Sequence, residues 1–146
     1  MSPLVVGIGS PHRGDDAIGI EVAKAVSALH LAGVDVIEAA EPIHLVDLIQ
    51  GYSLVVVVDA MLSGAAAGEV MVFDALPAPE FGPSSTHSLG VGQALELARV
   101  LDRLPLSLFL VGVEIAGATI GSELSGPVRA AIPNAATHVR SLLERG

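Results

Sequence analysis

Three polar side chains stand where an α/β fold would bring them together. Asp16 follows an apolar segment and a glycine-rich turn, Asp59 ends the run "SLVVVVDA", and His87 follows a long loop rich in proline and serine. Two carboxylates and an imidazole form a suitable ligand set for a divalent metal such as Zn²⁺ or Ni²⁺, with coordination positions left for water or substrate. These residues are the first candidates for a site that binds metal and does chemistry.

Each of these residues also has a structural explanation. An aspartate at the end of a strand often caps a turn, and a single histidine at the start of a helix is commonly a surface or capping residue. Asp15, the neighbour of Asp16, suits the first turn or the N-cap of a helix, where the helix dipole favours an acid. We assign this structural role to Asp15 and keep Asp16 for the site.

The glycine-rich turn "GIGSPHRGDD" resembles a phosphate-binding loop but lacks the residues that such a loop needs. The dinucleotide fingerprint requires glycine where the chain has His12, and the P-loop requires lysine where the chain has Asp15. Two adjacent carboxylates would also repel a phosphate and attract a cation. The turn therefore predicts a cation site and excludes a nucleotide phosphate site.

The composition narrows the function further. Seven lysines and arginines stand against sixteen acidic residues, which gives a formal net charge of −9 and disfavours nucleic acid and anionic membranes as partners. The chain has no cysteine, which excludes thiolate ligands and cysteine nucleophiles and favours the cytoplasm. No apolar run is long enough to span a bilayer. We expect residues 1–146 to form one domain and, since no spare apolar helix face is evident, a monomer.

Hydrophobic periodicity predicts a three-layer α/β/α sandwich with about five strands, mostly parallel, and one antiparallel strand. The helices are expected from about Asp16, over Glu41–Gly51, over His87–Leu104 with Ser85 or Thr86 as N-cap, and from Ser125 to the end with a kink at Pro133. The strands are expected at 4–9, 33–39, 53–60, 68–75 and 106–116, and the short connection before 68–75 marks that strand as antiparallel.

This order of elements gives the three candidates a common location. In an open α/β sheet, ligands bind beyond the carboxyl ends of the parallel strands. Asp16, Asp59 and His87 each follow or end a strand on that side of the predicted sheet. We therefore expect them to meet there although they are widely separated in the sequence.

Three segments together resemble the hydrogenase maturation proteases. They are "VVGIGSPHRGDDAIGIEVAKAV", "LVVVVDAMLSG" and "STHSLGVGQALELARVL", in this order and spacing. The glycine loop followed by D-[DE]-x-x-G is the most specific element, and the resemblance runs along nearly the whole chain. It implies a phosphorylase/hydrolase-like fold, with a twisted five-stranded sheet between helices.

The resemblance also implies an activity. The family trims the C-terminus of the [NiFe]-hydrogenase large-subunit precursor after nickel insertion, and its three metal-contacting positions match Asp16, Asp59 and His87. The metal would be Ni²⁺ carried by the precursor or another divalent ion such as Zn²⁺. It could polarise the scissile carbonyl or activate a water, or a carboxylate could act as general base. The loop "DALPAPEFGPSSTHS", together with His12 and Arg13, could contact the substrate.

Two other functions remain open at this stage. A phospho-receiver domain also has an acid pair after its first strand and an aspartate ending its third, but its lysine at the end of the last strand is missing, since Lys24 is the only lysine. A catalytically idle relative could bind metal or a hydrogenase subunit without cutting it. Phosphorylation of Asp59 would support the receiver, and failure to cleave would support the idle relative.

Overall fold

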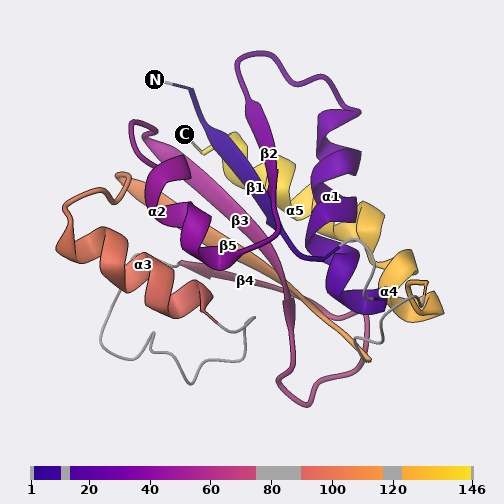
Figure 1. The fold of residues 1–146 in the computed structure, drawn as a ribbon. Helices are drawn as coiled ribbons and strands as arrows, with labels where there is room; N and C mark the ends of the chain where they lie inside the picture. The colour runs from indigo at the N-terminus through magenta and orange to yellow at the C-terminus, as the bar shows by residue number, and fades with distance from the viewer. Residues whose placement is uncertain (1, 11–13, 75–89, 117–122, 146) are drawn as a thin grey trace.

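The computed structural model describes residues 2–10, 14–74, 90–116 and 123–145. A five-stranded sheet forms the centre, with helices on both of its faces (Figure 1). The strands are β1 (Leu4–Ile8), β2 (Asp35–Ala39), β3 (Leu54–Met61), β4 (Val70–Asp74) and β5 (Ser107–Glu114). The α-helices are α1 (Ile18–Ser27), α2 (Leu45–Leu48), α3 (Val91–Val100), α4 (Gly126–Ala130) and α5 (Ile132–Leu143), and short 3₁₀ helices η1 (Gly14–Ala17) and η2 (Pro42–His44) precede α1 and α2. The predicted three-layer α/β/α sandwich is confirmed.

The sheet has the order β2-β1-β3-β5-β4. The four strands β2, β1, β3 and β5 are parallel, whereas β4 pairs antiparallel with β5. The prediction of one reversed strand is confirmed, and β4 forms its ladder with β5 rather than with β3, which precedes it in sequence. The central position of β3 explains its four consecutive valines, because a strand covered on both faces has no side exposed to water.

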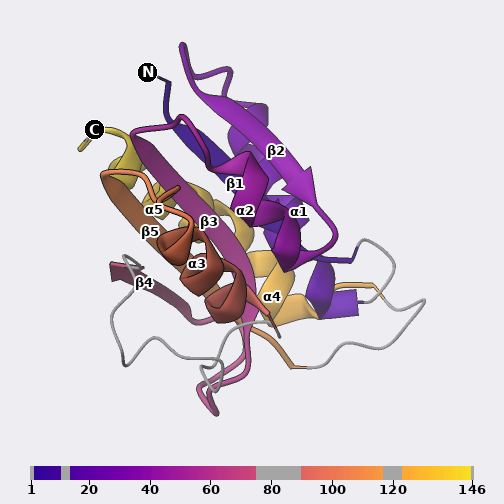
Figure 2. The ribbon, with the colours of Figure 1, turned by 60° about the vertical axis from the view of Figure 1, so that its left-hand side comes forward.

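Two hydrophobic cores fill the spaces between the sheet and the helices. Helices α1 and α5 pack against each other and cover one face, while α2 and α3 pack together on the other (Figures 1 and 2). Alternate residues of β3 enter the two cores, so Val55 and Val57 face α2 and α3 whereas Val56 and Val58 face α1 and α5. This two-sided burial fixes the register of β3, and with it the position of Asp59.

Several predicted helices differ in extent from the observed ones. Helix α3 begins at Val91 rather than at His87, because its N-cap Gly90 has a left-handed backbone with φ of 98°. Its proposed N-caps Ser85 and Thr86 lie outside the described residues. The expected kink at Pro133 is a complete break, since α4 ends at Ala130 and α5 starts anew with Pro133 in its first turn.

The topology also rules out the phospho-receiver alternative. Receivers have the all-parallel doubly wound order 2-1-3-4-5. Here β5 lies between β3 and β4, and β4 runs antiparallel at the edge.

Among the helices that the structure describes, none is both long and apolar enough to cross a bilayer.

The contact between β1 and α1 depends on two glycines. A Cβ added at Gly7 would lie 2.3 Å from the carbonyl oxygen of Gly19 and 2.7 Å from the Cβ of Ala23. A Cβ added at Gly19 would lie 2.2 Å from the Ile8 oxygen and 2.5 Å from the Val58 oxygen. The helix therefore approaches the sheet backbone more closely than any side chain would permit.

We expect Gly7→Ala to lower the free energy of unfolding by about 2 kcal/mol or more, because the added methyl group overpacks a backbone contact that cannot shift without moving α1. Urea unfolding followed by circular dichroism measures this loss. Gly126→Ala is the matched control, since a Cβ there has no heavy atom within 4 Å and should leave stability nearly unchanged. Equal stabilities of the two variants would contradict the proposed close packing.

Candidate active site

Asp59 lies near the carboxyl end of β3 and is completely buried. It pairs in register with Gly112 of β5, which has no side chain to occupy the space beside it. The side chain of Met61 fills that space, since a Cβ on Gly112 would lie 2.2 Å from its Sδ. Burying a carboxylate this deeply costs free energy unless the group is paired or hydrogen-bonded. Such costly burial is typical of a residue kept for function.

Asp16 lies in η1, which packs directly against β3. Unlike Asp59 it is only partly buried. Two close backbone contacts set its position. A Cβ on Gly9 would lie 2.3 Å from the carbonyl oxygen of Asp16, and Gly19 rests against the oxygen of Val58, the residue before Asp59. The structure therefore brings the turn that carries Asp16 onto the strand that carries Asp59.

Asp15 has a structural role, but the prediction that it caps its own helix is wrong. Helix α1 has Ala17 as its N-cap and no side-chain capping bond. The buried Asp15 carboxylate instead accepts hydrogen bonds from the backbone N–H of Ala116 at 2.9 Å and from the backbone N–H of Ser125 at 2.7 Å. The Ser125 hydroxyl donates a third bond at 2.9 Å. Asp15 thus joins η1 to two distant segments rather than capping its own helix.

Glu114 is a third buried carboxylate at this edge, and it was not among the residues predicted for the site. It ends β5 and is 2% exposed. Its oxygens accept hydrogen bonds from the backbone N–H of Ser63 at 3.0 and 3.2 Å and from the Ser63 hydroxyl at 2.5 Å. The signal was present in the sequence, because "SLFLVGVE" ends an apolar strand with a single acid just as "LVVVVDAM" carries Asp59 near its end.

His87 lies outside the described residues, as do His12, Arg13 and residues 75–89 of the proline-rich loop. The structure therefore places two members of the predicted set and not the third. Among the described residues no group of three His, Cys, Asp or Glu side chains is arranged to hold a metal ion. The two carboxylates that are placed nevertheless suit a divalent cation, since oxygen ligands from Asp bind Zn²⁺ and related ions.

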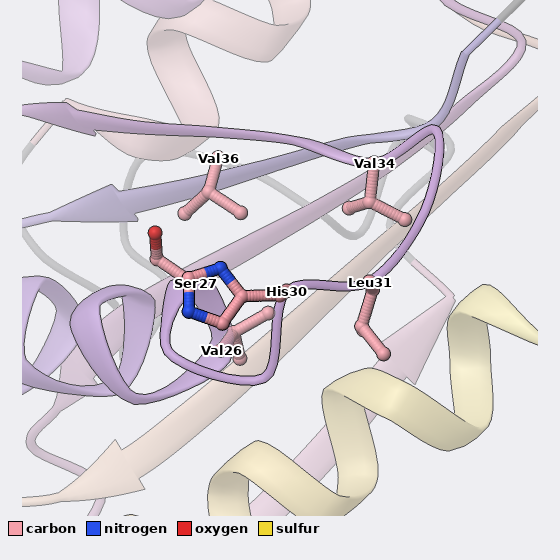
Figure 3. Close-up of a pocket in the computed structure, with 6 residues that line it drawn as sticks. All are labelled: Val26, Ser27, His30, Leu31, Val34 and Val36. Atoms are coloured by element: carbon pink, nitrogen blue, oxygen red, sulfur yellow. The ribbon is translucent and has the colours of Figure 1, made fainter.

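The described residues form two hollows, one at each end of the parallel strands. One, of about 360 Å³, is lined by the end of α1 and the start of β2, with His30 at its side (Figure 3). It opens at the amino end of the strands, the edge opposite to Asp16 and Asp59. The other, of about 350 Å³, lies between η2 and α3 and includes Ile43, Gly90 and Leu97. Since η2 follows β2, this groove is on the carboxyl side of the sheet.

Comparisons with known proteins assign the class. The family model HycI, described as hydrogenase maturation protease, matches residues 20–141, which include Asp59 and His87 and begin just after Asp16. Protein FrxA from Pyrococcus furiosus is 33% identical over 139 residues, which cover 91% of this chain and 98% of FrxA.

Solved structures with the same fold lead to the same class. The hydrogenase maturating endopeptidase HybD from E. coli superposes with a TM-score of 0.80 at 27% identity, covering all of this chain and 94% of that one. The [NiFe] hydrogenase maturation protease HycI from Thermococcus kodakarensis KOD1 gives 0.78 at 26% identity, covering 98% and 92% of the two chains.

The fold and these relatives define the chain as a peptidase with a three-layer α/β/α architecture. It belongs to the hydrogenase maturation protease family. The predicted family and enzyme class are confirmed.

We expect Gly9→Ala to reduce peptidase activity at least about 10-fold, because a misplacement of catalytic groups by 1 Å can cost as much as 100-fold. The added Cβ would lie 2.3 Å from the Asp16 oxygen and displace η1 from β3. Cleavage rate and urea stability are measured together on Gly9→Ala and on Gly126→Ala. A Gly9→Ala enzyme with the wild-type rate would show that the position of η1 does not matter.

Proposed function

We propose that Asp16, Asp59 and His87 form the catalytic and metal-contacting set of an endopeptidase that removes the C-terminal extension of a [NiFe]-hydrogenase large-subunit precursor after nickel insertion. One observation carries this proposal. The partly buried Asp16 is held by glycine contacts against the strand that buries Asp59, at the carboxyl edge of the sheet. In the sequence, His87 stands four residues before the start of α3 at Val91.

Nickel carried by the substrate would be bound by the carboxylates of Asp16 and Asp59. A precursor that carries Ni²⁺ presents a cation, and Asp16 and Asp59 supply oxygen ligands that favour it electrostatically. His87 supplies the imidazole of the set. A precursor without nickel lacks this attraction and should be held less well. The proposed recognition mark is thus the metal carried by the substrate.

The two carboxylates differ in environment, which suits them to different tasks. Buried Asp59 has a fixed geometry and is suited to hold the cation, whereas partly exposed Asp16 can reach water and substrate. A metal ion at this site would polarise the scissile carbonyl or lower the pKa of a water. Asp16 could itself take a proton from the attacking water if the metal only positions the peptide. Either route hydrolyses one peptide bond and consumes one water.

The surroundings of the reaction follow from the composition. A chain of net charge −9 without cysteine suits the reducing cytoplasm. We propose that the enzyme works there as a monomer. The proline-rich loop before His87 and the residues His12 and Arg13 are proposed to contact the extension of the substrate.

The decisive experiment compares nickel-loaded and nickel-free precursor as substrates of the purified enzyme. We expect trimming of the nickel-loaded precursor only, and a loss of at least about 100-fold in Asp16→Asn and in His87→Ala, the range typical of a missing acid–base or ligand group. Mass spectrometry of the precursor identifies the cleaved bond.

Asp102→Asn is the matched control. It removes one carboxylate by the same substitution at an exposed site, and asparagine tolerates its left-handed backbone with φ of 58°. This variant should cleave at the wild-type rate. Full activity of Asp16→Asn would contradict the site assignment, and a wild-type enzyme that cuts no precursor would favour the idle relative.

A further inference from the structure

We propose that Asp15 and Glu114 are positioning residues, which fix Asp16 and the end of β3 relative to each other through the carboxyl end of β5. The inference deepens the proposed function and rests on Asp16 and Asp59 acting there. Neither Asp15 nor Glu114 is proposed to touch the substrate.

Asp15 connects three segments that are far apart in sequence. Its Oδ1 accepts from the backbone N–H of Ser125, and its Oδ2 accepts from the N–H of Ala116 and from the Ser125 hydroxyl. Ser125 is the N-cap of α4, and Ala116 follows β5. The residue directly before Asp16 is therefore tied to the sheet and to α4 by charge-assisted bonds, which are stronger than bonds between neutral groups.

Glu114 makes the corresponding connection for Asp59. Its carboxylate holds both the N–H and the hydroxyl of Ser63, in the segment that leaves β3. Backbone hydrogen bonds add to this link. The N–H of Ile115 donates to the carbonyl oxygen of Met61 at 3.0 Å, and the N–H of Gly68 donates to the backbone carbonyl oxygen of Glu114 at 2.8 Å. The chain beyond Asp59 thus cannot move independently of β5.

The two connections meet within three residues at the end of β5. Glu114 holds the segment after Asp59, and Ala116 donates to the neighbour of Asp16. A displacement of either acid would require breaking bonds to this one short segment. The end of β5 therefore acts as the common reference for both carboxylates of the site, although it supplies neither.

The partners explain why these positions carry carboxylates. The carboxylates of Asp15 and Glu114 accept from N–H and O–H groups of Ala116, Ser125 and Ser63, so an amide side chain would present its own NH₂ to some of these donors. Asp15→Asn and Glu114→Gln keep the size of the side chain and disturb only this match. They should weaken the positioning while leaving the two hydrophobic cores intact.

The experiment measures kcat and KM for nickel-loaded precursor, and the affinity of the enzyme for Ni²⁺ by calorimetry. We expect kcat and Ni²⁺ affinity of Asp15→Asn and Glu114→Gln to fall about 10-fold or more, as is typical when groups that orient metal ligands are replaced. KM should change much less. A role in stability alone would not produce this pattern.

Val26→Ala provides the stability control. Val26 is buried in the core at the far end of α1, by the amino edge of the sheet, so its truncation destabilises the fold without touching the site. At an equal loss of melting temperature, Val26→Ala should keep the wild-type kcat and Ni²⁺ affinity. A kcat that falls equally in Val26→Ala and Asp15→Asn would overturn the inference.

Milder variants keep the test valid if Asp15→Asn fails to fold. Ser125→Ala and Ser63→Ala each remove one hydroxyl donor and should lower kcat, whereas Ser125→Thr and Ser63→Thr keep the hydroxyl and should restore it. Alanine variants with the wild-type kcat and Ni²⁺ affinity would overturn the inference.

The outcomes separate the inference from the proposed function. If the wild-type enzyme trims the precursor and the Asp15, Glu114 and serine variants keep its kcat and Ni²⁺ affinity, the proposed function stands and the inference is overturned. If the wild-type enzyme trims no precursor but binds Ni²⁺, and Asp15→Asn loses this affinity, the proposed function is overturned and the inference is supported. Wild-type enzyme that neither trims nor binds Ni²⁺ overturns both.

Discussion

The architecture depends on one close backbone contact, in which α1 lies directly on the carboxyl half of the central strands. Gly7 and Gly19 make it possible, since a Cβ on either residue would collide with backbone atoms. The consequence extends to the site. Because α1 lies so near, the short helix η1 in front of it meets β3, and Gly9 accommodates the backbone of Asp16. Gly7 and Gly9 therefore allow the helices to pack closely on the sheet, rather than binding a phosphate.

Buried carboxylates are the second constraint. Asp15, Asp59 and Glu114 are the buried charged residues of the described chain, and all three lie near the carboxyl edge. Burial of an ionised group is costly unless donors surround it, and Asp15 and Glu114 have such donors in backbone amides and serine hydroxyls. A fold that concentrates this cost at one edge of the sheet holds its carboxylates rigidly there.

The sequence predicted much of this because the signals were strong and local. The valine run of β3 could only be a buried strand, and Asp59 in it had to reach the carboxyl edge. Asp16 was expected at the same edge because it comes after the first parallel strand. Helix α3 was predicted to start too early, because the serine and threonine near His87 are good N-caps and the left-handed Gly90 gave no competing signal. The predicted antiparallel strand was correct, but its pairing with β5 is long-range and left no local trace.

The sequence by itself determined the class of fold and the family, and it made Asp16 and Asp59 the candidate acids. Hydrophobic periodicity, a glycine-rich turn without phosphate-binding residues and single acids on or after apolar strands are all properties of short segments. Only the tertiary structure decided which groups Asp15 and Glu114 bind. Asp15 binds residues 101 and 110 positions away, and Glu114 binds one 51 positions away. Such contacts exist only once the strands and helices have packed, so no short segment of the sequence can reveal them.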